Sequence, residues 1–290
     1  MSVIDVKSLA KDIKGKRILE DISFQVEEGE CLALIGPNGA GKTTLMSILL
    51  GDRPLTKGEV VVLGKKAGHE SLNRSISLLP QENQLPASFK VKELIAFYRS
   101  IYDEPLSEAR IQDYLGFDPG QMELLTSKLS GGQKRLLSFV LTLIGRPSLL
   151  FLDEPTSAMD TATRIRFWKI IEGLKATGMS IVYTSHYIEE IEQVADRLLV
   201  LHEGALVKDT TPYALKQEEQ VKAFTLPLRY ASLLKGLEGI EALKRKEDVL
   251  IFETSHPDAV WATLSQAGVR LMEVEISNRS LLHKIFEEGE

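Results

Sequence analysis

Short apolar runs alternate with amphipathic segments along most of the chain. The run Cys31–Ile35 is entirely apolar and bounded by turn residues, which is typical of a strand buried on both faces. By the same pattern we predict further strands at 18–26, 59–63, 75–79, 149–152, 179–184 and 197–202. Helical spacing of apolar residues predicts helices at 43–50, 91–125, 164–177 and 187–195. Strands that alternate with helices indicate a parallel sheet of the α/β class.

The pattern changes after about residue 211. The segment 217–220 is polar and reads as a linker, and beyond it we expect a strand at 249–253, a helix at 256–266 and a strand at 270–276. We therefore predict two domains, at 1–215 and 216–290, of which the second is a small α+β unit.

Composition narrows the class of protein. The 290 residues are 43% hydrophobic, which is enough for a packed core and excludes a largely disordered chain. The single cysteine excludes an intramolecular disulfide, and the net charge of -6 argues against a basic face for nucleic acid. No apolar run approaches the roughly 18 residues of a membrane span, and the N-terminus carries charges where a signal peptide is apolar. We expect a soluble intracellular protein that reaches a membrane only through other chains.

A glycine-rich loop follows the buried strand and precedes the predicted helix at 43–50. Residues 36–43 read GPNGAGKT and fit the pattern G-x-x-x-x-G-K-[ST], in which backbone N–H groups and the helix N-terminus hold phosphate oxygens. Lys42 would reach the β- and γ-phosphates, and the Thr43 hydroxyl would bind Mg²⁺. A plain glycine-rich turn is the alternative, but the strand before and the helix after favour nucleotide binding. The candidate ligands are consecutive: Gly36, Pro37, Asn38, Gly39, Ala40, Gly41, Lys42, Thr43 and Thr44.

Two acids follow the apolar run 149–152. In proteins with a phosphate loop this position lies beside the nucleotide, so Asp153 would hold Mg²⁺ and Glu154 would act as the general base on water. Acids also end strands at ordinary turns, and Pro155 supports a turn. Given the phosphate loop, the functional interpretation is favoured.

Three other sites carry candidate chemistry. The segment 129–133, LSGGQ, precedes a helical run and could be a second phosphate-binding surface formed by Ser130, Gly131, Gly132 and Gln133. Gln81 and His186 each follow a predicted strand. In isolation, the first segment could equally be a capping loop, whereas an exposed turn glutamine and a structural histidine are the favoured interpretations of the other two.

Together, these segments resemble in order the motifs of an ABC-transporter ATPase subunit. The matching segments are Walker A at 36–44, the Q-loop at 78–81, the LSGGQ signature at 129–133, Walker B at 149–155, the D-loop at 157–160 and the switch histidine at 184–186. The resemblance covers about residues 1–210. It implies a P-loop NTPase cassette with a mixed-sheet core, N-terminal antiparallel strands and a helical subdomain at about 82–146.

The family resemblance also implies a mechanism. Two subunits, as a homodimer or a heterodimer, pair head to tail, with ATP between Walker A of one and LSGGQ of the other. His186 would contact the γ-phosphate, Gln81 would link Mg²⁺ and the attacking water to a transmembrane permease, and Asp160 would couple the two sites. ATP closes the dimer and hydrolysis reopens it, at the cytoplasmic face of the cell membrane.

Two positions depart from the family pattern. The slot for an aromatic residue that stacks on adenine is occupied by Ile13, which offers only dispersion contact, so we expect weak base selectivity. The segment 274–286 resembles the C-terminal region of drug-exporter subunits. In those subunits an acid three residues after the serine completes a capping box, but here His283 stands three residues after Ser280.

Three functions remain in competition. The chain could energise a membrane exporter, serve a soluble assembly scaffold as in iron–sulfur assembly, or work on nucleic acid. Nucleic-acid relatives insert long coiled coils between Walker A and the signature or carry two cassettes, and neither feature occurs here. The C-terminal resemblance favours the exporter.

Overall fold

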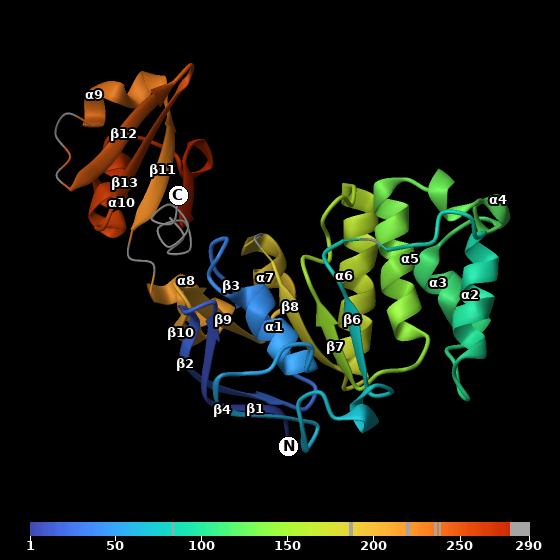
Figure 1. Ribbon diagram of the computed structural model, residues 1–290. Coiled ribbons are helices and arrows are strands. Elements are labelled where there is room, and N and C mark those ends of the chain that lie inside the picture. Colours follow the sequence, from blue (N-terminus) through green and yellow to red (C-terminus); the bar gives the residue numbers. More distant parts are fainter. Residues whose placement is uncertain (83, 186–187, 219–220, 235–236, 238, 279–290) are drawn as a thin grey trace. The chain divides into compact units, whose positions relative to one another are not determined.

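The computed structural model of the 290-residue chain describes all residues except 83, 186–187, 219–220, 235–236, 238 and 279–290 (Figure 1). The contacts divide the chain into two compact units, Met1–Thr211 and Pro212–Glu290. The boundary predicted from the sequence, between 215 and 216, falls just beyond this division.

A six-stranded sheet forms the centre of the first unit. Its order is β10-β9-β3-β8-β7-β6, and all neighbours are parallel except the edge pair β10 and β9. The strands are β3 (Cys31–Ile35), β6 (Ile76–Leu79), β7 (Leu149–Leu152), β8 (Ser180–Thr184), β9 (Arg197–His202) and β10 (Ala205–Thr210). Every residue of β3, β7 and β8 is buried, because helices cover the sheet. This mixed sheet confirms the predicted α/β cassette.

An antiparallel sheet packs beside it, in the order β2-β1-β4-β5. Its strands are β1 (Ser2–Ile13), β2 (Lys16–Glu27), β4 (Lys57–Val62) and β5 (Lys65–Lys66). In β2 every second residue from Ile22 to Val26 is buried, as expected for a strand with one face on the core. That face shares one apolar core with helix α1 (Lys42–Leu50).

Helices cover the central sheet and form the helical subdomain (Figure 1). The longer ones are α2 (Val91–Ser100), α3 (Glu108–Leu115), α5 (Gly131–Leu143) and α6 (Thr161–Ala176), with the shorter α4 (Pro119–Glu123), α7 (Ile188–Val194), η1 (Glu70–Leu72) and η2 (Thr126–Lys128). The helical stretch predicted at 91–125 is three helices, because Ser107 caps a new one and Gly116 ends it in a left-handed conformation.

The second unit has its own antiparallel sheet, in the order β12-β13-β11-β14. Its elements are α8 (Pro212–Glu218), β11 (Lys222–Pro227), η3 (Leu228–Tyr230), α9 (Ala231–Leu234), β12 (Ile240–Lys246), β13 (Val249–Thr254), α10 (Pro257–Gln266), η4 (Leu271–Glu273) and β14 (Glu275–Asn278). Phe224 of β11 stacks on Phe252 of β13 in its core, with ring centroids 5.4 Å apart. The strand predicted at 270–276 begins late, because a 3-10 turn occupies 271–273.

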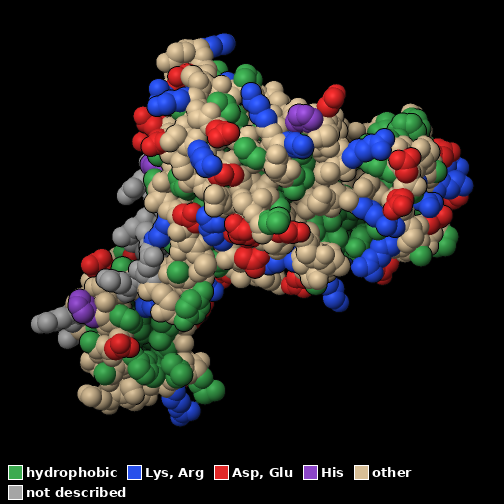
Figure 2. Space-filling model, turned by 90° about the horizontal axis from the view of Figure 1, so that it is seen from below, with side chains coloured by type: hydrophobic (Ala, Val, Ile, Leu, Met, Phe, Trp, Pro, Cys, Tyr) green, Lys and Arg blue, Asp and Glu red, His purple; other side chains and the backbone are tan. Residues whose placement is uncertain are grey.

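Hydrophobic side chains gather on one face of this unit, whereas acidic and basic side chains are interspersed over the first unit in the same view (Figure 2). Large exposed hydrophobic residues among the described part of the second unit are Tyr213, Leu243, Leu271, Met272 and Ile276. Among the described residues, no helix is both long enough and apolar enough to cross a bilayer.

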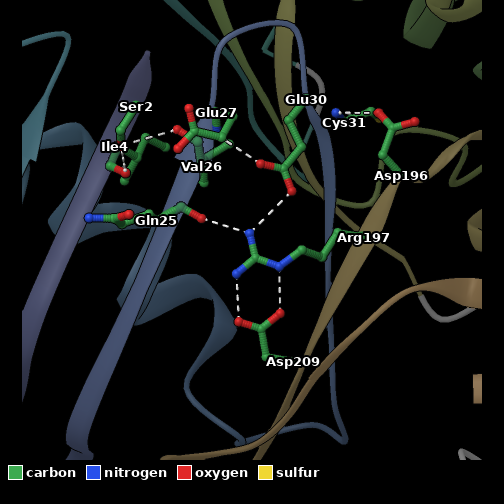
Figure 3. A network of polar contacts seen from close by, with 10 residues as sticks. All are labelled: Ser2, Ile4, Gln25, Val26, Glu27, Glu30, Cys31, Asp196, Arg197 and Asp209. Carbon is green, nitrogen blue, oxygen red and sulfur yellow. Dashed lines mark hydrogen bonds and ion pairs between the residues drawn. The ribbon is translucent and has the colours of Figure 1, made fainter. Parts of the chain in front are cut away.

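A polar network fixes the amino ends of two central strands (Figure 3). Arg197, the first residue of β9, forms a two-pronged ion pair with Asp209, lies 3.2 Å from Glu30 Oε1 and donates to Gln25 O over 2.8 Å. The hydrogen bond to Asp209 raises the pKa of Arg197 most, and Glu30 raises it further. Cys31, the first residue of β3, donates its N–H to Asp196 Oδ2 over 2.9 Å. The network therefore anchors β3 at the end opposite to the glycine-rich loop.

Candidate nucleotide-binding site

The glycine-rich loop joins β3 to α1, as the sequence predicts, and its backbone needs glycine at two positions. A Cβ on Gly36 would lie 2.1 Å from Leu201 O, and one on Gly41 would lie 2.5 Å from Leu19 Cδ2. Gly41 caps α1 in a left-handed conformation, with φ at 103°. The loop thus presents backbone rather than side chains at a helix N-terminus, which is the arrangement that binds phosphate.

Lys42 is held over this loop. Its ammonium donates to Gly36 O over 2.6 Å and to Pro37 O over 3.0 Å, and the residue is 8% exposed. Burial lowers the pKa of Lys42, while the nearby charges of Glu154 and Asp153 act in the opposite direction. The phosphate loop and the two acids therefore face one another. Further along, Thr43 is exposed and Thr44 half-buried, Asn38 and Gly39 are exposed and Ala40 is buried.

Asp153 and Glu154 follow β7, and the neighbouring strand β8 orients them. The Thr184 hydroxyl donates to Asp153 Oδ1 over 2.7 Å and accepts from the Glu154 N–H over 2.8 Å. On the other side, Asp153 N–H donates to Leu79 O at the end of β6 over 2.9 Å. The acids are thus fixed by both strands that flank β7.

Gln81 meets the second acid. Its Nε2 donates to Glu154 Oε2 over 3.0 Å, which brings together two residues that are far apart in the sequence. Glu154 has a φ of 45°, the left-handed region that non-glycine residues seldom occupy. Backbone strain of this kind occurs at functional sites, and here it lies at the residue that bonds Gln81.

Sequence reasoning missed Arg135, which lies on α5 and is 0% exposed. It donates from Nε to Pro155 O over 2.9 Å and from Nη2 to Asp153 O over 2.7 Å and Glu154 O over 3.0 Å. Nη1 donates to Pro80 O, beside Gln81. Burial lowers its pKa to about 10. One guanidinium therefore ties the Q-loop to the backbone of both acids. In the sequence, the feature that could have identified Arg135 is a single cation within an apolar helix face.

The LSGGQ segment begins α5 as predicted. The Ser130 hydroxyl accepts from Gln133 N–H over 3.2 Å, and Gln133 Oε1 accepts from Ser130 N–H over 2.9 Å, a reciprocal capping box. Gly131 is exposed, and a Cβ on the buried Gly132 would lie 3.4 Å from Ala158 O of the D-loop. The signature therefore packs on the D-loop of its own subunit and leaves the helix N-terminus accessible.

The remaining candidates have separate surroundings. Asp160 caps α6 by accepting from Thr163 N–H over 2.9 Å, and the hydrogen bonds from Thr163 lower the pKa of Asp160. Ile13 is half-buried and ends β1 opposite Lys16, while Leu19 of β2 contacts the phosphate loop. His186, like Ser280 and His283, lies outside the described residues. The assigned roles of all these residues stay predictions.

The donor set fits Mg²⁺. Among the residues that the structure describes, His, Cys, Asp and Glu form no group of three or more able to hold a metal. Mg²⁺ is usually bound by one or two carboxylates together with substrate phosphates, rather than by a cage of protein ligands. The Asp153 carboxylate and the Thr43 hydroxyl are oxygen donors of the required kind, near the loop that would hold the phosphates.

Comparison with known proteins agrees with this geometry. The family profile described as "ABC transporter" matches residues 19–157. The Nod factor export ATP-binding protein I of Rhizobium sp. (strain N33) is 33% identical over 287 residues, which cover 93% of this chain and 92% of the relative. The protein of the same name from Rhizobium etli is 34% identical over 94% of this chain and 90% of its own length.

Solved structures give the same result for the fold. A structure described as the ATP-binding subunit of an ABC transporter superimposes with a TM-score of 0.65 at 25% identity, over 74% of this chain and 92% of the other. A bacterial Atm1-family ABC exporter with ATP bound gives a TM-score of 0.65 at 24% identity, over 74% of this chain and 39% of the other. From its sequence relatives and from the site described above, the chain belongs to the ATP-binding subunits of the ABC transporter family.

Proposed function

We propose that this chain hydrolyses ATP to ADP and phosphate and thereby energises a membrane exporter. The observation that carries the hydrolysis is the convergence of Lys42, Asp153 and Glu154 where β3 and β7 end, with Gln81 bonded to Glu154. Support for export comes from the names of the relatives, which are export ATP-binding proteins. The relatives that align over more than nine-tenths of this chain include its C-terminal unit in the match.

The residues divide the chemistry between them. Lys42 and the loop N–H groups bind and neutralise phosphate oxygens, and Glu154 accepts the proton of the attacking water. Thr43 and Asp153, with Gln81 nearby, would hold Mg²⁺, which would neutralise charge on the phosphate oxygens. Gln81 holds the Glu154 carboxylate in place over 3.0 Å. His186, which lies outside the described residues, would contact the γ-phosphate. The chain's own contribution is mainly the positioning of charges.

Two subunits complete the site. The N-terminus of α5 presents Ser130 and Gly131 to solvent, and a helix N-terminus attracts an anion. In a head-to-tail dimer this surface would cover the phosphates bound at the Walker A loop of the partner. The D-loop residues Ala158, Met159 and Asp160 lie beside Gly132 of the signature. Asp160 would therefore couple nucleotide binding at one site to the other site.

A groove beside the Q-loop suits a helix of the permease. It has a volume of about 400 Å³ and runs from β6 and the Q-loop to the helical subdomain, with Glu82, Leu85, Tyr98, Tyr102 and Ser138 in its lining. Next to it, Phe97 of α2 and Ile101, the residue that caps the end of this helix, are each 55% exposed and lie one helical turn apart. Docking here would place the chain at the cytoplasmic face of the membrane. It would also couple movement of the cargo to Gln81. Nucleic acid is not an expected partner.

The test compares the purified chain with two variants in ATP binding and phosphate release. Lys42→Ala should lose nucleotide affinity, while Glu154→Gln should bind ATP, release no phosphate and accumulate as a dimer in light scattering. Hydrolysis by Glu154→Gln at the parent rate would remove Glu154 from the role of base. Co-purification with a multi-span membrane protein supports transport, and full function with soluble partners alone would contradict it.

A further inference from the structure

A buried carboxylate lies between two loops of the candidate site. Glu190, in α7, is 4% exposed. Its Oε1 accepts from the Thr156 hydroxyl over 2.7 Å, and its Oε2 accepts from the Ser185 hydroxyl over 2.8 Å. Thr156 and Ser185 are themselves 2% and 3% exposed. A charge in such surroundings is costly unless it is well paired, so these contacts are specific features of the fold.

The two hydroxyls belong to different functional segments. Thr156 follows Walker B, and its carbonyl accepts from Met159 N–H over 3.1 Å, which closes the turn of the D-loop. Ser185 directly precedes His186 in the sequence. Glu190 therefore joins the segment that carries the switch histidine to the turn that carries the D-loop.

A cation also lies close to this carboxylate. Arg164 Nε, on α6, lies 3.6 Å from Glu190 Oε1. Helix α6 begins directly after Asp160, the last residue of the D-loop, which caps it. The carboxylate is therefore connected to the D-loop twice, through Thr156 before it and through Arg164 after it.

We propose that Glu190 is a positioning residue for the switch-histidine segment: it ties Ser185, the residue before His186 in the sequence, to the D-loop turn of the same subunit. The inference rests on the proposed ATP hydrolysis, since His186 acts there on the γ-phosphate. A hydrogen bond to a charged acceptor is stronger than a neutral one, and two of them on one carboxylate fix both partners. Displacement of the Ser185 backbone would carry His186 with it, whereas the phosphate loop at residues 36–44 has separate supports.

Kinetics of Glu190→Gln give the first test. Glutamine keeps the shape but replaces one acceptor oxygen by an NH₂ group and removes the charge that faces Arg164. We expect kcat to fall between about 10-fold and 100-fold, as for a small misplacement of a reacting group, with the Kd for ATP within about twofold of the parent. Glu172→Gln, the same change at an exposed position of α6, should leave both values unchanged. An equal loss in Kd and kcat would contradict the proposal, as would an unchanged kcat.

A double-mutant cycle separates positioning from general damage. In a His186→Ala background, Glu190→Gln should lower kcat by less than about twofold, because the group through which it acts is already gone. If the fold-decrease in kcat of the double variant equals the product of the two single fold-decreases, the proposal is wrong. Ser185→Ala should resemble Glu190→Gln, and thermal unfolding of each variant reports whether it folds.

Histidine resonances provide a readout without any turnover. The chain has five histidines, and a His186→Gln variant assigns the signal of His186 in a spectrum of the ¹⁵N-histidine-labelled protein. Glu190→Gln should shift the His186 signal and leave the other four in place, and Glu172→Gln should shift none. An unchanged chemical shift of His186 in Glu190→Gln would contradict the positioning role. A parent chain that releases no phosphate would refute the proposed function instead, and the spectra would still decide the role of Glu190.

Discussion

The hydroxyl of Thr184 donates to Asp153 Oδ1 over 2.7 Å where two parallel strands end side by side. The same oxygen accepts the N–H of Glu154 over 2.8 Å. One side chain of β8 thereby orients the carboxylate of one acid and the backbone of the next on β7. Thr184 is 0% exposed, so water cannot replace it in either contact.

Thr184→Val should weaken the metal site more than the phosphate loop. Valine keeps the volume but leaves the Asp153 oxygen and the Glu154 N–H without this partner, at a cost of about 1–3 kcal/mol for each buried group. We expect the Mg²⁺ concentration for half-maximal ATP hydrolysis to rise about tenfold, since 1.4 kcal/mol is a factor of ten. Thr184→Ser, which retains the hydroxyl, is the matched control. Equal Mg²⁺ dependence in the Val and Ser variants would show that Asp153 is oriented by other contacts.

Arg135→Ala should destabilise the first unit and impair the site at once. The change removes the donors for the carbonyl oxygens of Pro80, Asp153, Glu154 and Pro155. We expect the free energy of unfolding of this unit to fall by about 3 kcal/mol, because buried acceptors lose charged donors. Denaturant titration measures it, and Lys134→Ala, the half-buried neighbour on α5, controls for helix propensity. A loss as small as that of the control would mean that the backbone is held without the guanidinium.

Base selectivity should be weak. Ile13 is half-buried at the end of β1 and can offer a purine dispersion but no ring stacking. We expect kcat/KM for GTP within about threefold of that for ATP, whereas Ile13→Tyr should favour ATP by restoring a ring worth about 1 kcal/mol. Strict ATP preference in the parent chain would show that other residues read the base. The Tyr variant would then leave the preference unchanged.

Cys31 should report opening of the central sheet. Burial raises its pKa to about 12, so the thiol is protonated and inaccessible in the folded chain. Because the folded pKa lies above the unfolded value of about 9, this group contributes stability below pH 9 that is lost as the pH rises towards 12. A thiol reagent at pH 8 should modify the folded chain at a negligible rate and label one cysteine per chain in denaturant. Rapid labelling without denaturant would mean that β3 opens readily.

The main elements of the site could be predicted because each motif is local. A glycine-rich loop between a buried strand and a helix, and two acids after a buried strand, identify themselves by spacing alone. Parallel strands then bring their carboxyl ends to one edge, which is why Gln81 and Glu154 meet. Fold class followed from the same alternation of strands and helices.

The supporting residues could not be assigned in this way, because their partners come from distant segments. Arg135 and Glu190 are charged residues at buried positions, and only the folded chain shows which carbonyls or hydroxyls satisfy them. In the second unit, β11 and β12 were not predicted from the sequence. Their polar and apolar residues alternate only weakly, and β12 runs into the charge-rich segment 244–248. Tertiary pairing with β13 decides their structure.

The order of strands in the central sheet has a consequence for biosynthesis. Strand β3 leads into the phosphate loop, yet both of its neighbours, β8 and β9, are made much later in the chain. A nascent chain that ends before residue 180 leaves both edges of β3 without these partners. The nucleotide pocket is therefore completed late in translation, although its most recognisable motif leaves the ribosome early. Until β8 and β9 are made, β3 has the unpaired apolar edges that favour aggregation.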